Sequence, residues 1–225
     1  MIVGIFFTAI SVVAAFGTPK DSGRLKKVNG IKTKAIVTMR HVIRSSLNVR
    51  IAFIAFAFIF AEGVGLIWIP IALVKHGYDA STAAFAYTLF GLGFMLSRFV
   101  GGVVTDRIGR VQVILVSTIV ATTGLIMFVQ LNILSLALIG AFIWGLGNSI
   151  GIAMCVSAMG DQPEQAGTRL RFLWTVVYIS NLVVGPAIGL LSAYLGLPIA
   201  MVVPVFLFLV VALIRHSVAP QETSP

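Results

Sequence analysis

The stretch Gly101-Gly102-Val103-Val104-Thr105-Asp106-Arg107-Ile108-Gly109-Arg110 separates two long apolar runs of this 225-residue chain. Residues 80–100 before it and residues 111–129 after it are nearly all apolar. A short charged run between two such segments predicts a tight turn at a membrane surface.

The residue types of this stretch suit such a turn. Gly101 and Gly102 would let a neighbouring helix approach closely, and Gly93, Ser97 and Gly101 recur every four residues as one packing stripe. Gly109 can adopt the left-handed backbone that ends a helix. The charged side chains can pair with one another, with helix ends or with lipid phosphates; they are Asp106, Arg107 and Arg110.

The composition indicates an integral membrane protein. Hydrophobic residues make up 59% of the chain and charged residues 10%, whereas a soluble domain is about one quarter charged. The net charge of +9 does not indicate nucleic acid, because the basic residues lie between apolar segments. We expect no metal and no cofactor, since the histidines and the single Cys155 lack metal-ligand spacing.

Six apolar segments follow a basic linker at residues 17–50, and each is long enough to cross a bilayer. They are expected at residues 51–74, 81–104, 111–130, 133–159, 170–195 and 197–215. Basic residues gather in the linker and in alternate connections, so the positive-inside rule predicts a cytoplasmic linker and a cytoplasmic tail at residues 217–225. The linker either only sets this topology or also contacts lipid or a regulator.

The chain opens with an apolar run at residues 2–16, shorter than the about 20 residues of a bilayer helix. No basic residue precedes it, so it is a poor secretory signal. We interpret residues 1–16 as a short transmembrane segment, either an anchor or the end of a longer helix.

The pattern Gly-x-x-x-Asp-Arg-x-Gly-Arg resembles the signature loop of the major facilitator superfamily (MFS) of secondary transporters. Its fixed positions here are Gly102, Asp106, Arg107, Gly109 and Arg110. The resemblance implies an all-α polytopic membrane protein, with a six-helix bundle of 3+3 inverted repeats at residues 51–216. A basic linker, six helices and a cytoplasmic tail are similar to helices 7–12 of the family, and residues 1–16 would then be the end of helix 6.

A complete member of that family has twelve helices in two halves, with the solute between the halves. We therefore expect the C-terminal half, either as a fragment or as a natural half-transporter. The missing partner would be an N-terminal half-transporter chain or a second copy of this chain.

Glu62 lies near the middle of the segment at 51–74, where a charge costs about 2.5–3.5 kcal/mol. It must be protonated, paired or in contact with water, so it is a candidate for proton or substrate coupling or for a structural hydrogen bond. Asn148 and Asn181 are candidates for solute binding or for hydrogen bonds between helices. Arg98 either extends to the cytoplasmic surface, or pairs with Asp106 or takes part in a cytoplasmic gate.

The expected function is secondary active transport of a small solute by alternating access, with the signature loop as a cytoplasmic latch in a bacterial inner (plasma) membrane. A proton is one candidate coupling ion. The alternative is a non-transporting scaffold or regulator, or an inactive fragment. An enzyme is not expected, because the sequence has no phosphate-binding loop and no catalytic Ser/His/Asp or His/Glu/His pattern at a shared membrane depth.

Overall fold

The computed structural model describes residues 39–220, which belong to one compact unit, Ala35–Pro225. The expected segment at 1–16, residues 17–38 of the expected linker and residues 221–225 of the expected tail lie outside the described residues.

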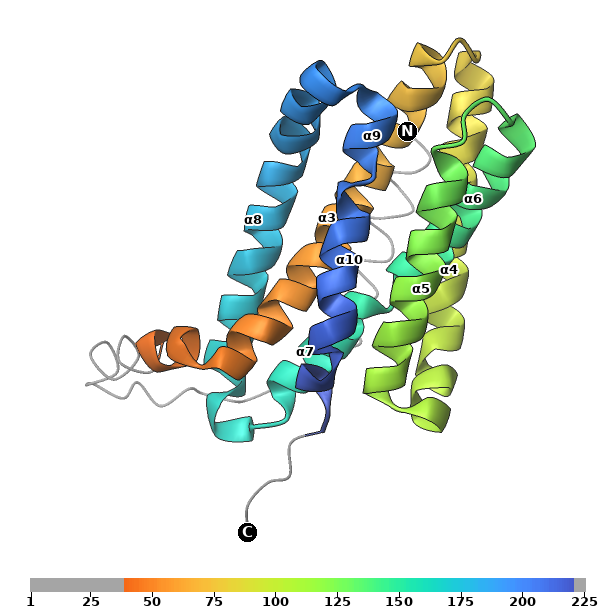
Figure 1. Ribbon diagram of the computed structural model, residues 1–225. Helices are drawn as coiled ribbons and strands as arrows, with labels where there is room; N and C mark the ends of the chain where they lie inside the picture. The colour runs from red at the N-terminus through yellow and green to blue at the C-terminus, as the bar shows by residue number, and fades with distance from the viewer. Residues whose placement is uncertain (1–38, 221–225) are drawn as a thin grey trace, which may run out of the picture. The chain divides into compact units, whose positions relative to one another are not determined.

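The described residues form helices and no strand, and Figure 1 labels the helices from α3 onward. They are α3 (Ser46–Lys75), α4 (Ala80–Ile108), α5 (Arg110–Phe128), α6 (Leu134–Asn148), α7 (Gly151–Gly160), α8 (Pro163–Leu195), α9 (Leu197–Met201), α10 (Val203–Ile214) and the 3-10 helix η1 (Arg215–Val218). Residues 39–44 are helical as well.

Six stretches of the described chain are helical, long and apolar enough to cross a membrane, which confirms the expected all-α polytopic fold. The fourth stretch consists of α6 and α7, and the sixth of α9, α10 and η1. Several helices extend into the expected connections: α3 begins at Ser46 and α8 at Pro163. The reason is length, since the 29 residues of α4 span about 43 Å and so cross the headgroup regions as well as the hydrocarbon core.

Tight connections join these helices. Gly109, with a φ of 78°, is the only residue between α4 and α5, and Gly196, with a φ of 82°, joins α8 to α9 in the same way. At the other end of α4, the Asp79 carboxylate caps the helix by accepting a hydrogen bond from the backbone N–H of Thr82 at 3.3 Å. Hydrogen bonds from Ser81 and Thr82 lower the pKa of Asp79 below its usual value.

The helix contacts show the 3+3 repeat. The first span contacts the fifth (α3 with α8), and the fourth contacts the second (α6 with α4). Likewise the third contacts the fourth (α5 with α6), and the sixth contacts the first (α10 with α3). If spans 1, 2 and 3 are exchanged with spans 4, 5 and 6, in that order, each contact is turned into the other contact of its pair. Because three spans reverse the direction of the chain, the two three-helix units are inverted.

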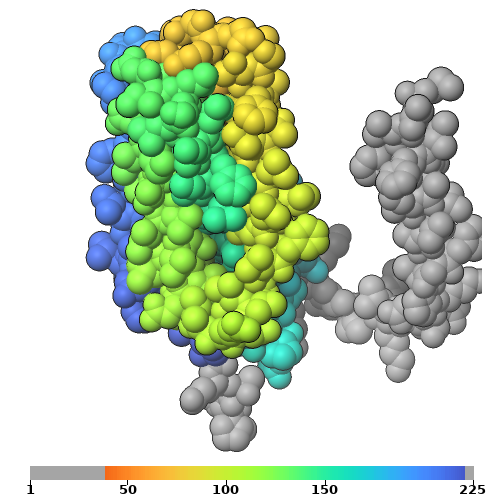
Figure 2. All heavy atoms as spheres, turned by 90° about the vertical axis from the view of Figure 1, so that its right-hand side faces the viewer, coloured from red at the N-terminus to blue at the C-terminus, as the bar shows by residue number. Residues whose placement is uncertain are grey.

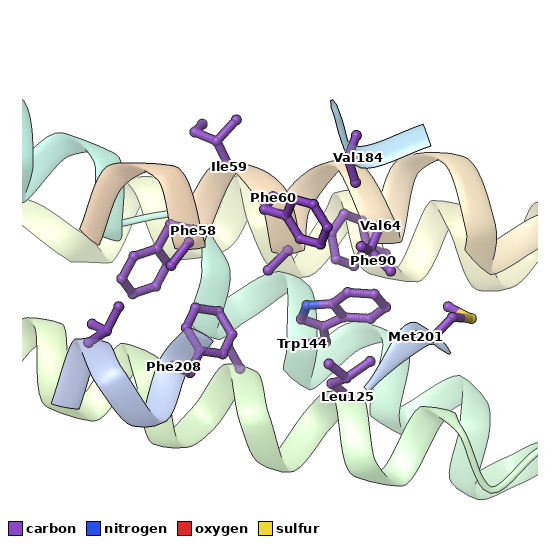
Figure 3. Packing of buried hydrophobic residues seen from close by; sticks show 14 of the residues in the cluster. Phe58, Ile59, Phe60, Val64, Phe90, Leu125, Trp144, Val184, Met201 and Phe208 are labelled. Atoms are coloured by element: carbon purple, nitrogen blue, oxygen red, sulfur yellow. The ribbon is translucent and has the colours of Figure 1, made fainter. Parts of the chain in front are cut away.

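The core lies where α3 and α6 cross the other helices. Trp144 of α6 is fully buried, and its ring meets Phe90 of α4 edge-on at 5.2 Å between centroids. Phe58 of α3 and Phe208 of α10 form a second aromatic contact at 5.1 Å. Figure 3 shows these rings between the helices. Such pairs contribute about 0.5–1.5 kcal/mol beyond the burial of their area.

The packing stripe on α4 is confirmed, because Gly93, Ser97 and Gly101 are all buried. A methyl group on Gly93 would collide with the backbone carbonyl of Phe142 in α6. The prediction was wrong for Gly102, which is exposed and has no atom within 4 Å of the place a Cβ would take. The reason is helical geometry: adjacent residues point about 100° apart, so only Gly101 continues the stripe.

One face of the bundle carries a groove of about 390 Å³ between α4 and α5, with the end of α6 at its floor. Figure 2 shows this face. The lining is apolar apart from two serines; it comprises Leu96, Ser97, Val100, Val104, Val113, Val116, Ser117, Val120, Leu146, Gly147 and Ile150. An apolar groove on a membrane-spanning body suits contact with lipid chains.

Candidate functional site

Glu62 lies half-buried in the middle of α3. It forms no ion pair within 4.0 Å with another described residue, but Arg98 of α4 is near enough for its charge to act on the carboxyl group. Glu62, Leu66, Pro70 and Val74 recur every four residues and share one face of the helix. Leu66 is 41% exposed and Val74 is 53% exposed, so this face of α3 is open.

Arg98 binds at a break in the fourth span. Its Nε donates a hydrogen bond to Ser149 Oγ at 3.2 Å, and its guanidinium lies 4.6 Å from the centre of the Phe94 ring. The expected alternative, a pair with Asp106, is not formed among these contacts. Asp106 is two turns further along the same helix, about 12 Å away along its axis.

The break between α6 and α7 consists of Ser149 and Ile150. Just before it, Asn148 is 2% exposed and donates from Nδ2 to the Phe58 carbonyl of α3 at 3.0 Å. Its Oδ1 has no partner among the described residues. Just after the break, Gly151 lies against the Phe58 ring so closely that no side chain would fit there.

Three of the predicted site residues therefore come together: Glu62, Arg98 and Asn148. Phe58 is one helical turn before Glu62, so Asn148 contacts that turn of α3 from α6, while Arg98 of α4 bonds to the neighbouring Ser149. Ser149 is the member that sequence reasoning missed. The run Gly147-Asn148-Ser149-Ile150-Gly151 could have revealed the break, because glycine, asparagine and serine are poor helix formers.

Asn181 does not join this group. It is exposed on α8, and its Nδ2 donates to the Val177 carbonyl of its own helix at 3.2 Å. The neighbouring Ser180 makes the link between helices instead, because its hydroxyl donates to the Phe56 carbonyl of α3 at 3.0 Å.

The signature residues lie at one end of the bundle, away from Glu62. Asp106 and Arg107 are exposed on the last turn of α4, and Gly109 forms the turn. Arg110 begins α5 and forms an ion pair with Asp161, with 2.7 Å between Nη1 and Oδ2. Asp161 follows α7, so this pair ties the signature turn to the connection between α7 and α8.

Arg169 of α8 extends this charged network, although sequence reasoning treated it only as part of a connection. It is 1% exposed, and its Nε donates to Asn48 Oδ1 of α3 at 3.0 Å. Its Nη2 donates to the Ala158 carbonyl of α7 at 3.3 Å, and the charge of Asp161 acts on it as well. The network therefore joins the ends of α3, α5, α7 and α8.

No group of three or more His, Cys, Asp or Glu residues that could hold a metal ion occurs within residues 39–220.

Comparison with known proteins shows the family. The sequence profile of the Major Facilitator Superfamily matches residues 1–183 and, in an overlapping match, residues 51–224. An uncharacterised MFS-type transporter of Yersinia pestis is 26% identical over 170 residues, which cover 75% of this chain and 44% of that protein. Another from Salmonella typhimurium is 31% identical over 156 residues, which cover 59% of this chain and 39% of that protein.

The fold comparison agrees. The crystal structure of the Escherichia coli fucose:proton symporter FucP superposes with a TM-score of 0.72 at 17% identity, covering 83% of this chain and 46% of the symporter. A structure of FucP in the outward conformation gives a TM-score of 0.68 at 16% identity, covering 86% and 48%. The chain spans less than half the length of each of these proteins. It is an integral membrane protein that belongs to the major facilitator superfamily, a family of transporters rather than enzymes.

Proposed function

We propose that this chain forms one half of a secondary transporter, which moves a small solute across a bacterial inner membrane by alternating access. The proposal is carried by two hydrogen bonds at the interrupted fourth span, one from Arg98 to Ser149 and one from Asn148 to the Phe58 carbonyl, one turn before Glu62. The charge of Arg98 also acts on Glu62. Interrupted helices at mid-membrane are where many transporters place their solute and ion sites.

Glu62 is proposed as the coupling carboxyl group, with a proton as the coupling ion. An ionisable group at this depth is costly and is usually functional. Its open face of α3 would give a proton a route to the carboxylate, while Arg98 is held by Ser149 rather than locked in an ion pair with Glu62. The fold neighbour FucP is named a fucose:proton symporter.

Asn148 is proposed as a solute ligand, because its buried Oδ1 could accept a hydrogen bond from a hydroxyl or amino group of the solute. Asn181 is a second candidate, since it is exposed on α8 and α8 packs against α3. Both proposals point to a polar solute with hydrogen-bond donors.

The network around Arg110, Asp161 and Arg169 is proposed as the latch. It connects the beginnings of α3, α5 and α8. Any rocking of α3 and α8 relative to α5 must therefore stretch or break a charged contact. These contacts would hold the bundle in one conformation until solute binds. The basic residues at this end predict that the latch faces the cytoplasm.

The test is Glu62→Gln in proteoliposomes that contain the purified full chain with any partner that co-purifies. The measurement is solute-induced proton uptake, followed with a pH-sensitive dye over a panel of sugars and amino acids. We expect the substitution to abolish proton uptake while solute exchange without a gradient persists, because glutamine keeps the size but not the proton. The matched control is Glu164→Gln, an exposed acid in the first turn of α8. Unchanged proton uptake in Glu62→Gln would remove the coupling role.

A further inference from the structure

A polar pocket of about 200 Å³ lies where α3 and α8 begin, remote from the mid-membrane site. In Figure 1 these helix beginnings lie at the lower left. The pocket is lined by His41, Ser45, Leu47, Asn48, Gln162, Gln165 and Arg169, of which only Leu47 is apolar. A lining of this kind suits a polar ligand.

Hydrogen-bond donors that have no partner within residues 39–220 surround this pocket. The side chains of Ser45, Gln162 and Gln165 make no hydrogen bond with any described residue. Arg169 adds a buried positive charge, whose position is fixed by its bonds to Asn48 and to the Ala158 carbonyl. The pocket therefore offers several neutral donors beside one held guanidinium group.

Two helix beginnings add to the positive potential. Ser45 and Gln162 are the N-cap residues of α3 and α8, and neither caps its helix with a side-chain hydrogen bond. First-turn N–H groups are thus left without a side-chain acceptor, at the positive ends of two helix dipoles. Arg40 and Arg44 are exposed on the adjoining helical residues 39–44.

The acidic groups nearby offset this potential only in part, because the charge of Asp161 acts on both Arg110 and Arg169. Asp161 is paired with Arg110, and Glu164 is exposed on α8 and does not line the pocket. The free volume far exceeds the about 30 Å³ that one water takes in the liquid. A tetrahedral anion with several oxygen acceptors suits donors that come from two helix ends and an arginine.

We propose that this pocket binds a phosphate group, which holds the beginning of α3 against the beginning of α8. The phosphate comes either from a phospholipid headgroup or from free phosphate in solution. The pocket shares Arg169 with the proposed latch but uses none of the residues at the mid-membrane break. Loss of phosphate-dependent stability can therefore be distinguished from loss of proton uptake at Glu62.

The test compares the thermal stability of the full chain in nanodiscs under two conditions. In one arm, phosphatidylcholine nanodiscs receive inorganic phosphate or chloride at equal ionic strength. In the other, phosphatidylglycerol replaces phosphatidylcholine and no phosphate is added. The variant is Gln165→Glu, which places a negative charge in the lining. Since Gln165 is in the first turn of α8, where acids favour a helix, the variant should fold.

The matched control is Gln112→Glu, an exposed glutamine in the first turn of α5. We expect inorganic phosphate or phosphatidylglycerol to raise the melting temperature of the wild type and of Gln112→Glu. We expect the apparent affinity of Gln165→Glu for phosphate to fall about tenfold, or its response to phosphatidylglycerol to disappear. A response to phosphate assigns the soluble source, and a response to phosphatidylglycerol alone assigns the headgroup. No response in either arm, or equal responses in Gln165→Glu and the wild type, would overturn the proposal.

Discussion

Asn148 donates a hydrogen bond from α6 to the Phe58 carbonyl of α3, whereas Asn181 donates to Val177 of its own helix. The first asparagine is 2% exposed and the second is exposed. Both lie in apolar spans, so hydropathy alone treats them alike. Only the position on the helix face decides which one holds two helices together.

This difference predicts unequal effects of two alanine substitutions. Asn148→Ala should lower the melting temperature, because it removes a contact between helices and leaves a cavity. Hydrogen bonds between membrane helices contribute about 0.6 kcal/mol on average, and the cavity adds to that cost. Asn181→Ala should leave the melting temperature unchanged within error. Thermal unfolding of the two variants in one detergent is the measurement, and equal losses would contradict the assignment.

The sequence could identify Glu62 and Arg98, because a charge inside an apolar span is conspicuous in any linear reading. It could not identify their surroundings. Ser149 and Asn48 are common residue types that gain importance only from partners 51 and 121 positions away in the chain. Those partners are set by how the helices pack, and no local pattern encodes that packing.

At the scale of a single helix, the sequence pattern again predicted some features and missed others. The spacing of Gly93, Ser97 and Gly101 predicted one buried stripe on α4, and the structure confirms it. Hydropathy also predicted six spans, yet it treated residues 133–159 as one helix. The break at Ser149 and Ile150 was missed because two residues barely change the mean hydropathy of a long apolar window.

The stripe gives a prediction at two glycines of α4. Gly93→Ala should destabilise the bundle by about 1–3 kcal/mol, because the new methyl group collides with the Phe142 backbone, which cannot rotate away. Gly102→Ala should be neutral or stabilising, since its surroundings are open and alanine favours a helix. Unfolding of both variants is followed in the same detergent. A stable Gly93→Ala would show that α4 and α6 can separate without cost, against the close approach described here.

The spans differ strongly in how much of their surface is buried, and this difference bears on whether the bundle exists alone or in a larger assembly. In the most apolar window of each helix, 67% of residues are buried for α3, but only 28% for α4 and 22% for α8. Both of these less buried helices contact α3. The face of α3 that carries Glu62 is itself open toward Val74. An ionisable group on an open face at mid-membrane would meet hydrocarbon in an isolated bundle, which is costly.

We therefore predict that the purified chain is found in an assembly larger than its own 24.0 kDa. A second six-helix body, either another copy or a different multi-span chain, would cover the Glu62 face and enclose a pathway at the same time. The measurement is the mass of the detergent-solubilised complex by native mass spectrometry, with its subunits identified. Glu62→Leu should make a lone bundle more stable in detergent. It should not stabilise a true assembly, because position 62 would then face a polar pathway, where a leucine is not favoured. A monomer of 24.0 kDa that Glu62→Leu stabilises would contradict the half-transporter and favour the alternative, a scaffold or regulator or an inactive fragment.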